Sequence, residues 1–107
     1  MNHFTDKAGY NGIRAGKDWL FRAAQPPGDR PFGAYFTTLP PETRRLSTRL
    51  RIPKRKLEYV FCFVDVGDLV SLDGDRGDYI FYSKVDYAVE PARQQYKGER
   101  KSCPLAE

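Results

Sequence analysis

The sequence predicts a single α+β domain, built mostly from short strands with two short helices in its first half. Its length of 107 residues suits one domain. Residues 57–66 are apolar at both sets of alternate positions, as expected for a central strand that is covered on both faces. Other short apolar stretches are separated by turns rich in Gly, Pro and Asp.

The first 31 residues are expected to form a strand, a helix and a loop. Residues 2–5 suit a short strand, after which Asp6 can cap a helix that runs to about Arg14. Residues 17–24 fit a strand and a helix equally well. Residues 25–31 contain three of the eight prolines and one glycine, which favours a loop.

A second strand and helix are expected next. Residues 33–39 favour a strand that ends at two prolines, and Pro41 suits the first turn of a helix reaching about Leu50. That helix would turn Leu46 and Leu50 inward and its arginines outward. Pro53 is expected to end it.

The second half is expected to contain strands alone. After the central strand, short strands are predicted at 69–72, 79–83 and 86–89, with a tight turn at 73–77. Residues 97–107 are expected to form a frayed tail of the single domain, because they are polar and lack periodicity.

Composition excludes several classes of function. Two cysteines, Cys62 in an apolar run and Cys103 in the polar tail, are too few for a disulfide scaffold and favour a reducing compartment. A single histidine and no paired-cysteine motif argue against a metal site. No apolar run is long enough to cross a membrane, and neither a P-loop nor a dinucleotide-binding Gly motif is present.

Two segments carry residues suited to binding a nucleotide. The first is His3-Phe-Thr5, in which an imidazole nitrogen and a hydroxyl can bind ribose. The second is Gly33-Ala-Tyr35-Phe-Thr, where glycine permits close approach and Tyr35 can stack on a flat ring. Taken singly, the first is more typical of a polar residue at a frayed N-terminus, and the second of an ordinary strand whose tyrosine faces the core.

Taken together, the two segments resemble the ADP-ribosyltransferase superfamily. The shared pattern is His-aromatic-Thr, a helix with Gly-x-x-Gly-Ile, and then Gly-x-Tyr-Phe-Thr about thirty residues later. It is most similar to the branch of diphtheria toxin and the poly-ADP-ribose polymerases, and within it to polymorphic-toxin domains named for His, Tyr and Asp. Tyr-Phe-Thr-x-Leu-Pro-Pro and the stretch 78–89 add to this likeness, which covers residues 2–96.

The resemblance implies a small ADP-ribosyltransferase fold of two packed, mostly antiparallel sheets with short helices. It implies NAD as the substrate and no metal. His3 would bind the adenosine ribose with support from Thr5, and Tyr35 would stack on nicotinamide beside Gly33. An acid would then stabilise the positive charge that develops on the ribose as nicotinamide leaves.

Three residues compete for the role of that acid. Relatives in the polymerase group have Glu-Tyr-x-Val, and two places here match it with Asp: Asp86-Tyr-Ala-Val and Asp78-Tyr-Ile-Phe. We favour Asp86 over Asp78, because toxin-type relatives keep an acid after a Phe-Tyr-x-x segment. Glu90 is the third candidate, and at least two of the three are expected to be ordinary solvated carboxylates.

The resemblance also implies a biological setting. The chain begins just before the histidine motif, so we expect the catalytic end of a longer delivered effector that acts in the cytoplasm of a target cell. Its producer would need an immunity protein. The leading acceptor is a cytosolic protein, with translation elongation factors as the first candidates, and no membrane is involved.

A basic run leaves two alternatives open. Residues 44–56 contain seven Lys and Arg side chains and no acid, and the formal net charge is +4. Such a run is often a solvated helix face, but it also suits nucleic-acid phosphates. One alternative is therefore an ADP-ribosyltransferase or related transferase that acts on RNA or DNA. The other is a non-catalytic basic module that binds RNA or protein.

Overall fold

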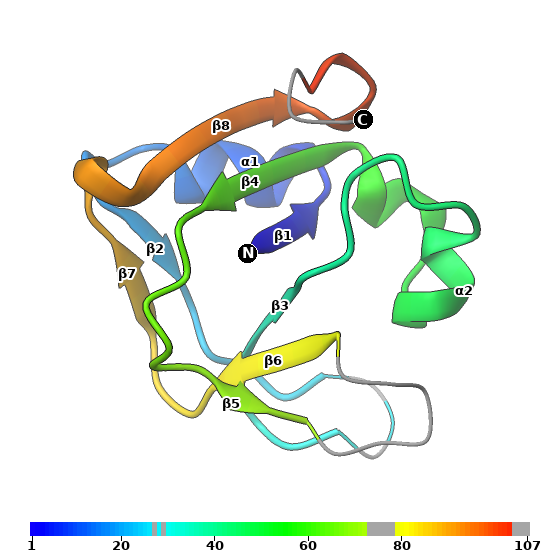
Figure 1. Cartoon of the computed structure of the whole chain (residues 1–107), viewed down its shortest axis with the longest axis horizontal. Coiled ribbons are helices and arrows are strands. Elements are labelled where there is room, and N and C mark those ends of the chain that lie inside the picture. The colour runs from blue at the N-terminus through cyan, green and yellow to red at the C-terminus, as the bar shows by residue number, and fades with distance from the viewer. Residues whose placement is uncertain (27, 29, 73–78, 104–107) are drawn as a thin grey trace.

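Two antiparallel sheets and a few short helices make up the protein, so the α+β prediction is confirmed (Figure 1). The computed structural model describes residues 1–26, 28, 30–72 and 79–103. One sheet has six strands in the order β5-β6-β3-β1-β4-β8, and the other pairs β2 with β7. The strands are β1 (Asn2–Thr5), β2 (Trp19–Phe21), β3 (Ala34–Thr37), β4 (Tyr59–Phe63), β5 (Val70–Ser71), β6 (Ile80–Ser83), β7 (Tyr87–Val89) and β8 (Gln94–Glu99).

Strand β4 lies between β1 and β8 and is covered on both faces, as its double apolar pattern predicts. Val60 and Cys62 face one hydrophobic cluster, whereas Phe61 and Phe63 face the other. Because a strand turns successive side chains to opposite faces, this one segment holds both halves of the core together.

An aromatic cluster fills the space between the two sheets. Trp19 and Phe21 of β2 and Tyr87 of β7 pack there against Phe36 and Phe61 of the large sheet. The ring of Phe21 meets those of Phe36 and Phe61 edge to face, with centroids 5.1 and 5.7 Å apart. The ambiguous stretch 17–24 thus contains a strand whose two aromatic side chains point inward.

The opposite face of the large sheet is covered by helical segments. Helix α2 (Leu46–Leu50) and the 3₁₀ turn η1 (Lys54–Leu57) place Leu46, Leu50 and Leu57 against this face. The prediction that the arginines of this helix point outward is confirmed, since Arg45 and Arg49 are exposed.

The predicted start of this helix is wrong. The helix begins at Leu46 rather than near Pro41, because Arg45 at its N-cap adopts a left-handed backbone with φ of 56°. Arg51 at the C-cap has φ of 58°, so both ends are bounded by residues in a conformation that arginine seldom adopts.

Helix α1 (Lys7–Ile13) begins as predicted. The carboxylate of Asp6 accepts a hydrogen bond from the main-chain N–H of Gly9 at 2.9 Å, which is an N-cap contact. The helix contacts β1, β2 and β4, and Tyr10 and Ile13 pack on the aromatic cluster while Ala8 is exposed.

The prediction of a frayed tail is wrong for residues 97–103. Strand β8 pairs with β4 over its length, and the 3₁₀ turn η3 (Arg100–Ser102) then brings Cys103 into the core beside Cys62. The inward positions of β8 are held by Gln94, Tyr96 and Gly98, so this strand lacks the apolar alternation that would have identified it. The turn predicted at 73–77 lies outside the described residues.

Candidate functional site

His3 lies where strands β1 and β3 separate. The two strands pair only at Asn2 and Thr37, and beyond that point the imidazole of His3 spans the space between them. Its Nδ1 donates a hydrogen bond of 2.8 Å to the main-chain carbonyl of Tyr35. The structure therefore joins the two segments that the sequence singled out, through a side chain of one and the backbone of the other.

The imidazole of His3 is neutral at physiological pH. Burial lowers the pKa of His3 to about 4, although the hydrogen bond to Tyr35 opposes this and the charge of Lys56 adds to it. A carbonyl only accepts, so Nδ1 carries the hydrogen and Nε2 has a lone pair. Within the described part of the chain, Nε2 has no hydrogen-bond partner.

Main-chain groups also face the space between β1 and β3. The N–H of Phe63 on β4 donates to the carbonyl of Met1, the residue before β1, so alternation directs the polar main-chain groups of His3 toward β4 as well. The N–H and C=O of Phe4 therefore point toward β3, beyond the last registered pair of that ladder. By this alternation, one main-chain donor and one acceptor of Phe4 face β3.

Tyr35 lies on the other face of the large sheet from the His3 ring. Its ring stacks on that of Tyr82, with centroids 5.5 Å apart and planes 16° apart. Its hydroxyl donates to the carbonyl of Pro31 at 2.5 Å, and the Arg30 guanidinium lies 5.8 Å from the ring centroid. Burial raises the pKa of Tyr35. The side chain of His3 thus bonds the backbone of Tyr35, but the rings of the two residues lie on opposite faces of the large sheet.

Thr5 and Gly33 have clear packing roles. A Cβ at Gly33 would lie 2.6 Å from the carbonyl oxygen of Ser83, so glycine allows β3 to approach β6 closely. A Cβ at Gly9 would lie 2.0 Å from the Thr5 hydroxyl oxygen, so Thr5 packs against the first turn of α1. The contact with Ser83 accounts for glycine at position 33 without a ligand.

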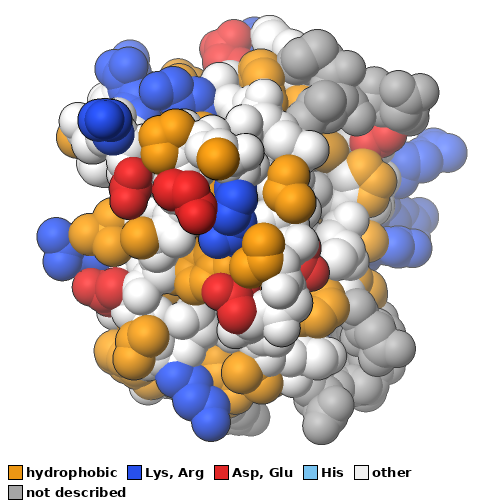
Figure 2. Space-filling model, turned by 60° about the vertical axis from the view of Figure 1, so that its left-hand side comes forward, with side chains coloured by type: hydrophobic (Ala, Val, Ile, Leu, Met, Phe, Trp, Pro, Cys, Tyr) orange, Lys and Arg blue, Asp and Glu red, His pale blue; other side chains and the backbone are white. Residues whose placement is uncertain are grey.

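Asp86 lies just before β7 and is exposed. Its Oδ1 accepts a hydrogen bond of 2.8 Å from the main-chain N–H of Ala23, and its Oδ2 lies 3.8 Å from a guanidinium nitrogen of Arg22. On the face of the molecule around β2 and β7, acidic, basic and hydrophobic side chains are intermixed (Figure 2).

The segment that carries Asp86 nevertheless adjoins the other candidate segments. Ala24, one residue beyond the partner of Asp86, forms a bridge with Gly33 at the start of β3. On the other side, Phe21 pairs with Tyr87 and its ring centroid lies 4.8 Å from that of His3. The four segments therefore meet at one end of the two-stranded sheet.

The other acidic candidates are less informative. Asp78 lies outside the described residues. Glu90 is exposed, and its carboxylate lies 3.4 Å from Arg93. No carboxylate of a described residue forms a hydrogen bond with the side chain of His3 or Tyr35.

A polar network beside the aromatic cluster could not be foreseen from the sequence. The Tyr87 hydroxyl donates to Asp68 at 2.6 Å and accepts from Arg93 at 2.8 Å. Burial raises the pKa of Tyr87, and the bond to Asp68 raises it further. The guanidinium of Arg93 also bonds the carbonyl of Val64 at 3.0 Å. These residues come from three separate segments of the sequence. Only Tyr87, which lies in the Asp-Tyr-Ala-Val stretch, belongs to a motif that the sequence could have indicated.

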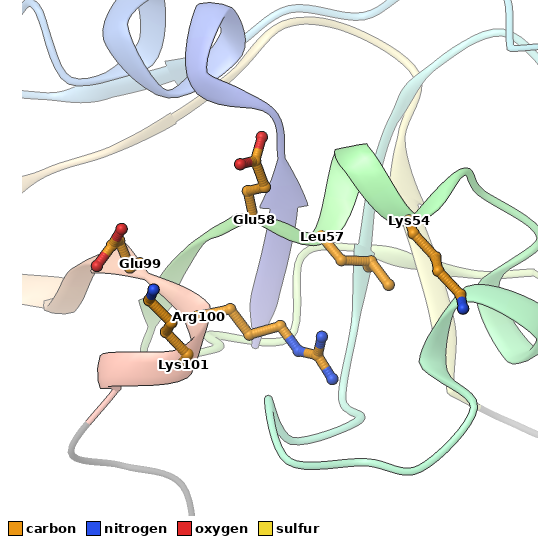
Figure 3. A pocket seen from close by; sticks show the side chains of 6 residues that line it. All are labelled: Lys54, Leu57, Glu58, Glu99, Arg100 and Lys101. Carbon is orange, nitrogen blue, oxygen red and sulfur yellow. The ribbon is translucent and has the colours of Figure 1, made fainter.

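Two open hollows occur away from these residues. One, of about 240 Å³, is lined by Lys54, Leu57, Glu58, Glu99, Arg100 and Lys101 (Figure 3). The other shares Arg100 and Lys101 and continues to Pro41 and Glu42. Neither is bordered by a residue that the sequence predicts to bind NAD.

The described residues contain neither a cluster of side chains that could hold a metal ion nor a helix that could span a membrane. No three His, Cys, Asp or Glu side chains in that part of the chain are grouped to hold a metal ion. None of its helices has the length and apolar character needed to cross a membrane.

Comparison with known protein families, with curated proteins and with solved structures gave no match to this chain.

Proposed function

We propose that the protein is an NAD-dependent ADP-ribosyltransferase whose NAD site is the gap between β1 and β3. One observation carries the proposal: a neutral His3 bonds the Tyr35 carbonyl at 2.8 Å at the point where the β1–β3 ladder ends. The two segments that resemble the transferase motifs are distant in sequence, and this contact supports their acting together.

The chemistry of this gap fits the two ends of NAD. The N–H and C=O of Phe4 match the carbonyl and NH₂ of the nicotinamide carboxamide. The lone pair of His3 Nε2 suits a ribose hydroxyl, which can donate to it. Arg30, whose guanidinium lies 5.8 Å from the ring centroid of Tyr35, is suited to a phosphate.

The packed interior restricts where NAD would lie. Aromatic side chains fill the space between the sheets, so a nicotinamide ring would occupy the edge of the gap rather than the core. Tyr35 would contact it only after its hydroxyl releases Pro31. Some movement of side chains on binding is therefore part of the proposal.

The reaction would follow from NAD itself. The bond between the nicotinamide nitrogen and C1′ of the ribose breaks, and neutral nicotinamide leaves with the electron pair. A nucleophile on the acceptor forms the new bond to C1′ and loses its proton to solvent. A carboxylate near C1′ would stabilise the oxocarbenium-like transition state, and Asp86, next to Ala23 and close to Gly33, is our first choice.

The setting that we propose is that of a delivered toxin domain. It would act in the cytoplasm of a target cell, and its producer would carry an immunity protein. The competing proposal is a non-catalytic binding module. The exposed position of Asp86 and its bond to Ala23 favour that alternative, because they occupy the carboxylate with a structural contact.

Substitution of the acids tests which of them acts in the proposed transfer. Asp86→Asn keeps an oxygen for the Ala23 N–H but removes the charge, so we expect NAD binding to persist and nicotinamide release to fall by about 100-fold or more. Asp78→Asn serves as the matched control and should have a mild effect. Calorimetric NAD binding and nicotinamide release measured on both variants check this. The reverse pattern would assign the role to Asp78, and unchanged release in both would exclude the pair.

A further inference from the structure

Helix α2 and the residues that flank it carry basic side chains that form no salt bridge with a described residue. We define the α2 basic surface as Arg44, Arg45, Arg49 and Lys54. All four are exposed, and none forms a salt bridge with a described residue. The other basic residues of this run are already engaged: Arg55 and Lys56 each lie 3.4 Å from Asp6, and Arg51 has an interaction of its own.

This surface leads directly to the Tyr35 side of the large sheet. The hydroxyl of Tyr79 donates to the carbonyl of Arg49 at 3.3 Å, and the carbonyl of Tyr79 accepts from Thr37 of β3 at 2.6 Å. Burial lowers the pKa of Arg30, and the positive charge of Arg51 lowers it further, so these two cations lie near each other. The guanidinium of Arg30, 5.8 Å from the ring centroid of Tyr35, adds a further cation on this side of the sheet.

An exposed aromatic side chain lies in the loop just before β3. Phe32 is 52% exposed and follows Pro31, whose carbonyl is held by the Tyr35 hydroxyl. No other aromatic side chain of the described residues is as exposed. An exposed ring offers a face on which a base can stack, whereas an acidic protein would need the positive charges alone.

We propose that the α2 basic surface binds single-stranded nucleic acid, with Phe32 stacking on a base beside Tyr35. If the proposed transferase activity holds, nucleic acid is then the acceptor. The nucleophile would be a hydroxyl, phosphate or ring nitrogen of the bound strand, which bonds to C1′ of the ribose as nicotinamide leaves and releases one proton.

Binding can be tested without NAD. The probe is a fluorescein-labelled single-stranded RNA of about 16 nucleotides, the upper range of one domain's site, followed by fluorescence anisotropy at several salt concentrations. The test variant replaces the four residues of the α2 basic surface with Gln. The matched control replaces four exposed cations elsewhere, Arg14, Lys17, Lys84 and Lys97, so both variants change the net charge from +4 to 0.

We expect the test variant to bind at least tenfold more weakly than the control at about 100 mM salt, with the slope of the salt dependence reduced by about 0.7 for each phosphate that is no longer neutralised. Phe32→Ala should weaken binding by about tenfold, whereas Val85→Ala, which shortens an even more exposed apolar side chain, should not. If the fourfold variant fails to fold by circular dichroism, the pairs Arg44→Gln/Arg45→Gln and Arg49→Gln/Lys54→Gln replace it.

Three results would overturn the proposal. The first is no binding of RNA by the natural chain at about 50 mM salt, and the second is an equal reduction of binding in the test and control variants. The third is displacement of RNA by poly-glutamate of equal charge together with no effect of Phe32→Ala, which would indicate an acidic protein partner. Nicotinamide release is measured separately. RNA binding without nicotinamide release would contradict the proposed transferase activity but support nucleic-acid binding by the α2 basic surface.

Discussion

His3 is the only histidine of the chain, and its position shows how a single residue can tie two motifs together. Its ring contacts Phe21 and Phe36, and its Nδ1 bonds the backbone of Tyr35. Sequence reasoning identified His3 and Tyr35 as candidates by residue type and spacing. It could not show that their rings lie on opposite faces, because that depends on the register of β1 against β3.

The buried position of His3 predicts an acid-sensitive stability. The pKa is about 4 in the folded state and near 6.5 in an unfolded chain, so the unfolded state binds more protons between these values. The contribution of His3 to the free energy of unfolding is therefore present above pH 6.5 and is lost as the pH falls toward 4. Its upper bound is about 3 kcal/mol, and the partial exposure of the ring reduces it.

Urea unfolding at pH 7, 5.5 and 4 tests this prediction. His3→Gln keeps a polar side chain but removes the titrating group, so its free energy of unfolding should fall less between pH 6.5 and 4 than that of the natural chain. The variant serves as the baseline for the carboxylates, which titrate in both proteins. Identical slopes in the two proteins would show that His3 is not held neutral.

Tyr35 provides a direct test of ring contact with nicotinamide. Tyr35→Ala should reduce nicotinamide release by about 100-fold or more, since a misplaced substrate alone costs about that much. Tyr35→Phe keeps the ring and loses only the hydrogen bond to Pro31, so its activity should stay near normal and its stability should fall by about 1 kcal/mol or less. Near-normal release by a folded Tyr35→Ala protein would remove this residue from the site.

At the scale of elements, strong hydrophobic patterns were predictive and weak ones were not. Strand β4 was identified because both of its faces are apolar. Strand β8 was missed because its inward positions hold Gln94, Tyr96 and Gly98, and its pairing comes from β4 rather than from its own pattern. The late start of α2 depends on the left-handed backbone of Arg45, which a sequence pattern does not indicate.

Helix α1 contains two glycines that should respond oppositely to alanine. Gly12→Ala meets no atom within 4 Å and should stabilise the protein by up to about 1 kcal/mol, because glycine is a poor helix former. Gly9→Ala would place its Cβ 2.0 Å from the Thr5 hydroxyl oxygen, so it should destabilise the protein by about 1–3 kcal/mol.

Thermal or urea unfolding of the two variants measures this difference. Thr5→Ala removes the clashing hydroxyl, so the double variant Thr5→Ala/Gly9→Ala should recover part of the stability that Gly9→Ala removes. Equal effects at the two glycines, or no recovery in the double variant, would contradict the close packing of α1 on β1.

At the scale of the whole molecule, the two faces of the large sheet contact different elements and carry different candidate residues. One face meets the aromatic cluster, β2 and β7, and it holds the ring of His3. The other face meets α2 and η1 and carries Tyr35 and the α2 basic surface. The proposed NAD gap lies between β1 and β3 in the middle of this sheet, so a substrate bound there is within reach of both faces.

Transfer of ADP-ribose is the central claim, and one measurement tests it most directly. The protein is incubated with NAD labelled on its adenylate phosphate and a bacterial lysate, beside His3→Ala, and the products are separated on a gel with and without nuclease. We predict released nicotinamide and a macromolecular label, absent with His3→Ala and removed by nuclease if the acceptor is nucleic acid. Absence of both label and nicotinamide release, with a folded natural protein, would contradict the transferase and leave a binding module as the function.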